Sequence, residues 1–153
     1  MKKQSEGQPP QPTRSLKEFN ILIGEWTMVG THPMMRSAVH GNSSFEWLRE
    51  NTLLVWHFDW EPDQPVPSAF SVIGHDDTVD VCTMLYTDTR GVARIYQMSL
   101  ADGIWKMWRD SEDFSQRMTG TFSDNKRTIT WKGEMSHDGT TWEQDLSVTF
   151  TRK

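Results

Sequence analysis

The spacing of the turn signals constrains the fold of this chain more than any other feature of its sequence. From about Gly24 onward, short segments in which apolar and polar residues alternate are separated by turn sequences such as Arg90-Gly91 and Asp102-Gly103. Alternation with a period of two is typical of antiparallel strands, and Asp-Gly favours a tight hairpin. Such a sheet has no unpaired edge only when it closes on itself. The sequence therefore predicts an all-β fold, a closed antiparallel up-and-down barrel of about ten strands.

The amino-terminal region differs in composition from the rest of the chain. Residues 1–14 are polar and rich in Gln and Pro, which predicts a flexible tail, and residues 15–153 are expected to form a single barrel domain. At the junction, Ser15 and Glu18 fit a capping box before apolar Phe19 and Leu22, which predicts one short helix. The chain shows no apolar signal segment or membrane span, so we expect a cytoplasmic protein.

Charge and cysteine content exclude several classes of function. A net charge of -5 and the lack of a basic run argue against nucleic-acid binding. The single cysteine, Cys82, excludes an intrachain disulfide and a thiolate metal cluster, and no histidine spacing predicts a metal site. His57 and Asp59 share one face of a predicted strand, but that face is the outer one. The sequence contains no nucleophile elbow, phosphate loop or dinucleotide fingerprint.

The lining of the barrel follows from assigning each strand by its more apolar face, because a shift of one residue would turn every side chain to the other side. Eight Trp, seven Phe and nine Met supply bulky side chains that either line a cavity or pack against each other. Further inward residues are Leu54, Trp60, Phe114, Trp142 and Leu146. The predicted ligand-binding residues are Trp56, Phe58, Tyr86, Arg94, Tyr96, Met98, Trp105, Met107, Arg109, Gln116, Met118, Trp131 and Gln144.

Arg94 and Arg109 carry the main indication of function. A guanidinium in an apolar interior is costly unless it is paired, so two of them favour a ligand with an anionic end. Alternatively, each arginine reaches water at the rim or pairs with an aspartate such as Asp88 or Asp110.

We therefore expect a barrel that binds a largely apolar or amphipathic small molecule with an anionic or polar end, without a cofactor. Two alternatives are an enzyme of the isomerase, cyclase or hydrolase type, using an interior Tyr, Asp or His, and a filled barrel that acts through protein partners or as a homodimer.

Gly24-Glu25-Trp26, which follows the predicted helix, resembles the G-x-W signature of lipocalins and other calycins. The resemblance implies that Trp26 closes the base of the barrel and that Arg152 of the last strand stacks on it. Longer segments resemble an uncharacterised bacterial family of calycin-like domains, which implies a barrel without naming a ligand. They are Phe45-Glu46-Trp47-Leu48, Val72-Ile73-Gly74-His75-Asp76, Tyr86 to Val92, and Phe122-Ser123-Asp124 to Trp142-Glu143.

Nitrobindins, ten-stranded haem-binding relatives of this broad group, offer a sharper comparison. Their G-x-W-x-G-x-G run is matched at Gly24, Trp26 and Gly30, but Met28 stands in place of the middle glycine. The resemblance implies haem binding through a histidine of the final strand. Because residues 142–146 of this chain contain no histidine, we expect no haem here.

Overall fold

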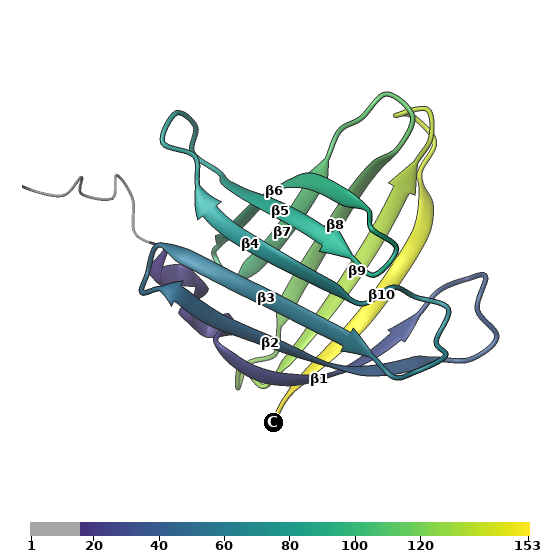
Figure 1. The fold of residues 1–153 in the computed structure, drawn as a ribbon, viewed down its shortest axis with the longest axis horizontal. Coiled ribbons are helices and arrows are strands. Elements are labelled where there is room, and N and C mark those ends of the chain that lie inside the picture. The colour runs from purple at the N-terminus through teal and green to yellow at the C-terminus, as the bar shows by residue number, and fades with distance from the viewer. Residues whose placement is uncertain (1–15) are drawn as a thin grey trace, which may run out of the picture.

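Ten strands close into one antiparallel barrel in the computed structural model, which describes residues 16–153 (Figure 1). Each strand pairs with its neighbours in sequence, and β1 pairs with β10 to complete the ring. The predicted closed up-and-down barrel is therefore confirmed. The strands are β1 (Gly24–Thr31), β2 (Val39–Arg49), β3 (Leu53–Trp60), β4 (Ala69–His75), β5 (Cys82–Asp88), β6 (Ala93–Ala101), β7 (Ile104–Arg109), β8 (Ser115–Phe122), β9 (Thr128–Ser136) and β10 (Glu143–Arg152).

The short helix before β1 is a 3-10 helix, η1 (Lys17–Leu22). Its N-cap is Leu16, whose side chain makes no capping hydrogen bond, while Ser15 of the expected capping box and the tail at 1–14 lie outside the described residues. The helix is held by burial instead, because Phe19 and Leu22 are fully buried at one end of the barrel. Within residues 16–153, no helix is long and apolar enough to cross a membrane.

Trp26 closes that end of the barrel. Its side chain is fully buried, and its Nε1 donates a hydrogen bond to the Leu22 carbonyl oxygen (2.8 Å). The Arg152 guanidinium lies 4.1 Å from the centre of the Trp26 ring and donates to the Ile23 carbonyl oxygen (2.7 Å). The expected stacking of Arg152 on Trp26 is therefore confirmed, and it ties β10 to η1.

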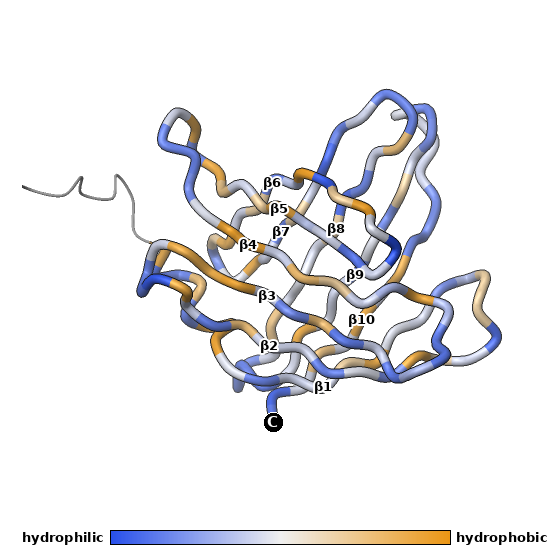
Figure 2. Tube along the Cα trace, viewed as in Figure 1, coloured by the Kyte–Doolittle hydropathy of each residue, from blue (hydrophilic) through white to orange (hydrophobic). Residues whose placement is uncertain are grey.

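The strands alternate between buried and exposed residues, which is why one face forms the interior. In β3, Leu54, Trp56 and Trp60 are buried while Asp59 is exposed. Figure 2 shows the same alternation along the chain, and it shows that the loops joining β7 to β8 and β9 to β10 are hydrophilic. Those loops lie at the end of the barrel opposite η1, and that end stays open.

Candidate functional site: a cavity at the open end of the barrel

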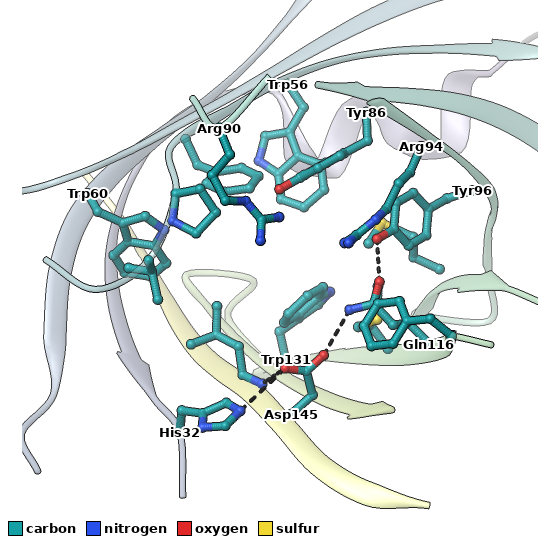
Figure 3. A pocket seen from close by; sticks show the side chains of 17 residues that line it. His32, Trp56, Trp60, Tyr86, Arg90, Arg94, Tyr96, Gln116, Trp131 and Asp145 are labelled. Atoms are coloured by element: carbon teal, nitrogen blue, oxygen red, sulfur yellow. Dashed lines mark hydrogen bonds and ion pairs between the residues drawn. The ribbon is translucent and has the colours of Figure 1, made fainter. Parts of the chain in front are cut away.

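A cavity of about 250 Å³ occupies the open half of the barrel (Figure 3). Its wall is built from the ends of the strands and from loops at this end, and it combines aromatic side chains with a few charged ones. The lining residues are His32, Trp56, Phe58, Trp60, Val66, Pro67, Tyr86, Arg90, Arg94, Tyr96, Met107, Phe114, Gln116, Met118, Trp131, Asp145 and Leu146.

Most of the residues predicted to bind a ligand lie in this wall. They are Trp56, Phe58, Tyr86, Arg94, Tyr96, Met107, Gln116, Met118 and Trp131. Met98 and Trp105 face inward as expected, but both are fully buried below the cavity. Arg109 lies opposite Gln116 at the end of β7, with its guanidinium 6.0 Å from the centre of the Tyr96 ring, but it does not line the cavity. Gln144 is exposed and does not line the cavity.

A bulge in β10 explains the position of Gln144. Between Gln144 and Ser147 the pairing with β9 shifts by one residue, so the simple alternation assumed from the sequence fails there. Asp145 and Leu146 then both reach the cavity. The bulge needs Gly133 on the facing strand, because a Cβ atom at that position would lie 2.6 Å from the Leu146 carbonyl oxygen. The expectation that Gln144 faces inward was therefore wrong.

Sequence reasoning also missed lining residues that come from loops. Val66 and Pro67 belong to the connection between β3 and β4, and Arg90 belongs to the turn after β5. His32 is the first residue after β1. Loops carry no periodic signal that shows which way a side chain points. For His32, the only available signal was its place at the end of the first strand.

The floor of the cavity is a layer of stacked aromatic rings. Phe45 and Trp56 are stacked with ring centres 5.1 Å apart, and Trp105 meets Trp56 edge-on at 5.2 Å. The Trp56 Nε1 donates to the Ser43 hydroxyl (2.8 Å), which holds the indole in place. The interior is thus filled at the closed end and open above this layer, so the barrel is not completely filled.

A chain of polar contacts crosses one side of the cavity (Figure 3). The Tyr96 hydroxyl donates to Gln116 Oε1, and Gln116 Nε2 donates to Asp145 Oδ2 (2.8 Å). The other carboxylate oxygen accepts from the Leu146 backbone N–H (2.8 Å) and lies 3.6 Å from His32 Nε2. Burial raises the pKa of Tyr96, which the neighbouring arginines partly offset. The phenol therefore stays protonated at neutral pH.

Tyr86, Asp88 and Arg90 form a second polar cluster at the rim. The Tyr86 hydroxyl (2.8 Å) and Arg90 Nη2 (2.7 Å) both donate to Asp88 Oδ2. Burial and the bond to Asp88 raise the pKa of Tyr86. Burial also opposes the charge of Asp88, but hydrogen bonds from Arg90 and Tyr86 outweigh it and lower the pKa of Asp88 to about 2. The charge of Arg90 is therefore balanced by Asp88.

Arg94 carries a charge that is not balanced in this way. It is half-buried, and its guanidinium lies 5.0 Å from the centre of the Phe114 ring. In the described part of the chain, no carboxylate forms an ion pair with Arg94 or Arg109, since Asp88 is engaged by Arg90. Figure 3 shows the Arg94 side chain directed into the cavity. This wall can therefore hold an anionic group.

Possible metal ligands are not clustered in the described part of the chain. No group of three or more His, Cys, Asp or Glu side chains within residues 16–153 is arranged to hold a metal ion.

Comparison with known proteins relates the chain to others by its fold. Neither the family models nor the curated proteins give a match. Among solved structures, the crystal structure of Rv2717c from M. tuberculosis matches with a TM-score of 0.62, over 94% of this chain and 99% of that one, at 11% sequence identity. A match at this identity shows a shared fold and nothing more. The chain thus has the barrel architecture of a bacterial protein of nearly equal extent.

Proposed function

We propose that this barrel binds a small, largely apolar molecule that carries an anionic group. The observation that carries the proposal is Arg94, whose guanidinium enters a mainly aromatic cavity without a carboxylate partner. Leaving a charge partly desolvated and unpaired costs free energy, which an anion from the ligand would recover. Asp145 keeps its negative charge while its oxygens accept from Gln116 and Leu146, so the anionic group is expected beside Arg94 and away from Asp145.

The size of the cavity limits the ligand. At about 250 Å³, the cavity lies just under the range of roughly 300–1,000 Å³ that is usual for drug-sized ligands. A molecule of one or two rings fits inside, and a longer one would extend through the open end. The aromatic walls at Trp56, Phe58 and Trp131 favour a flat apolar body.

Naphthalene-2-carboxylate and its neutral amide test this proposal. They have the same ring system and differ in charge, so their dissociation constants, measured by calorimetry, isolate the contribution of the anion. We expect Arg94→Met to weaken binding of the carboxylate by about 1.5–3 kcal/mol, the range for hydrogen bonds to charged groups, which is about tenfold to a hundredfold. Binding of the amide should change little.

Arg49→Met is the matched control, because Arg49 is exposed at the end of β2 near the closed end and its loss removes the same charge far from the cavity. It should leave both dissociation constants unchanged. Equal binding of the carboxylate by wild type and Arg94→Met, or equal effects of the two arginine variants, would contradict the proposal.

We infer further that the cavity does not hold haem. Histidine is the usual protein ligand of haem iron, and the histidine in the cavity wall is His32. Its Nδ1 accepts a hydrogen bond from the Met34 N–H (3.1 Å), so in the neutral ring Nε2 carries the proton and faces Asp145. Tyr86 and Tyr96 donate their protons to other groups and have raised pKa values, which disfavours a tyrosinate ligand. Methionine serves haem iron mainly beside a histidine.

Addition of haemin should therefore produce no stoichiometric shift of its Soret band. The titration is monitored by absorbance, with apomyoglobin as a positive control for the haemin stock. A shift that saturates at one equivalent would show that His32 leaves its polar contacts to ligate iron, and it would contradict this inference.

We also propose that the chain is a calycin-like barrel, as its G-x-W sequence suggests. The stack of Arg152 on Trp26 beneath a short helix supports this placement.

A further inference from the structure

The direction of the hydrogen bonds on the cavity wall determines what the wall can offer a ligand. The chain from Asp145 to Tyr96 starts at a carboxylate, which can only accept hydrogen bonds. Its Oδ1 accepts from the Leu146 N–H, and its Oδ2 accepts from Gln116 Nε2. Asp145 therefore requires the Gln116 side chain to present its NH₂ group on this side.

The orientation of Gln116 then determines the orientation of the Tyr96 hydroxyl. With Nε2 directed to Asp145, the amide oxygen faces Tyr96 and must accept from it. The hydroxyl proton of Tyr96 is thus committed to the wall, so the Tyr96 oxygen can only accept hydrogen bonds, and Arg94 is one donor that lies within reach of it. Tyr86 is in the same position, because its proton is donated to Asp88.

Arg94 stands beside this acceptor. It lies two residues before Tyr96 in β6 on the same face of the strand, and both side chains reach the cavity. The Arg94 guanidinium lies within hydrogen-bonding reach of the Tyr96 hydroxyl, so an anionic group at Arg94 and an adjacent group of the same ligand would meet the guanidinium and the Tyr96 oxygen together. At that second point the wall accepts a hydrogen bond and does not donate one.

We propose that Tyr96 is a specificity-determining residue that selects acids carrying an N–H or O–H donor next to the acidic group. This inference rests on the proposed binding of anions at Arg94. An analogue with an oxygen acceptor in place of the donor would set its lone pair against that of Tyr96, and the mismatch would lower its affinity.

Indole-2-carboxylate and benzofuran-2-carboxylate test the inference. The two acids have the same shape and charge, but the first has a ring N–H and the second a ring oxygen beside the carboxylate. Calorimetry should show that wild type binds indole-2-carboxylate about tenfold more tightly, as expected for one hydrogen bond gained against one lost. Tyr96→Phe should reduce the ratio of the two dissociation constants to about one.

Asp145→Asn gives the sharpest result, because it should reverse the chain. The Leu146 N–H holds the amide oxygen of the new side chain, so its NH₂ group faces Gln116 and donates to the Gln116 oxygen. Gln116 must then turn its own NH₂ group toward Tyr96, and the Tyr96 proton is released into the cavity. The preference should shift toward benzofuran-2-carboxylate. Asp110→Asn, an exposed change at the same end of the barrel, should keep the wild-type ratio.

The outcomes separate this inference from the proposed function. Arg94→Met should weaken both acids, because both carry the carboxylate, while Tyr96 still favours the acid with the N–H donor. If wild type binds both acids equally and Arg94→Met weakens both, the function stands and the role of Tyr96 is refuted. A wild-type preference that survives Tyr96→Phe also refutes that role. If neither acid binds, both proposals are refuted.

Discussion

Trp26→Ala is expected to lower the free energy of unfolding by about 3–5 kcal/mol, the range for removing a large aromatic side chain from a core. Trp26 is fully buried, and its loss opens a cavity between η1 and the barrel floor. It also leaves the Leu22 carbonyl oxygen without its indole donor and removes the ring beneath the Arg152 guanidinium. Urea unfolding monitored by circular dichroism measures the change.

Trp142→Ala provides the matched control. Trp142 also stacks with an arginine, since the Arg117 guanidinium lies 3.9 Å from the centre of its ring. Unlike Trp26, however, Trp142 is half-exposed. We expect this variant to lose less than about 1 kcal/mol, as for an exposed cation–π pair. A similar loss in the two variants would show that Trp26 contributes only its stacking, and that the base of the barrel closes without it.

Gly41→Ala is expected to lower the free energy of unfolding by about 1–3 kcal/mol or more, although it adds a single methyl group. Gly41 lies in β2 opposite Trp60 of β3. A Cβ atom there would lie 2.3 Å from the Asp59 carbonyl oxygen, which belongs to the backbone and cannot turn away. The two strands would have to separate, and because Trp60 lines the cavity, ligand affinity should fall as well. Thermal unfolding and binding of naphthalene-2-carboxylate measure the two effects.

Gly74→Ala separates this crowding from the general effect of replacing a strand glycine. Its nearest contact would be the end of the Leu53 side chain, at 3.2 Å, which can shift. We expect a change within about 0.5 kcal/mol, as for substitutions without a specific clash. If Gly41→Ala is as mild as Gly74→Ala, then β2 and β3 do not need their close approach.

Local sequence predicted the fold well because each local signal agrees with the barrel. The hairpin at Asp102-Gly103 places positive φ angles where the turn needs them (54° and 72°). Turns of this kind force neighbouring strands to pair, and the chain is long enough to close the ring. The stack of Arg152 on Trp26 joins residues far apart in sequence. The resemblance to lipocalins implied it, whereas alternation alone did not.

The candidate site was predicted only in part, because it depends on where the alternation of inward and outward side chains along a strand is interrupted. In β6, alternation holds, and Arg94 and Tyr96 reach the cavity as expected. In β10, the bulge brings Asp145 inward and turns Gln144 outward. The bulge is made possible by Gly133 on the neighbouring strand. The sequence of β10 itself does not indicate that a bulge is present.

The sequence by itself determined the closed barrel and the inward face of most strands, since both follow from the period of two and from turn residues that act over a few positions. Only the tertiary structure decided how deep the interior is filled, which loop residues complete the wall, and the path from Asp145 through Gln116 to Tyr96. The reason is that these features arise from contacts across the barrel, where Trp105 meets Trp56 and the rim loops converge. Such contacts exist only once all ten strands are in register.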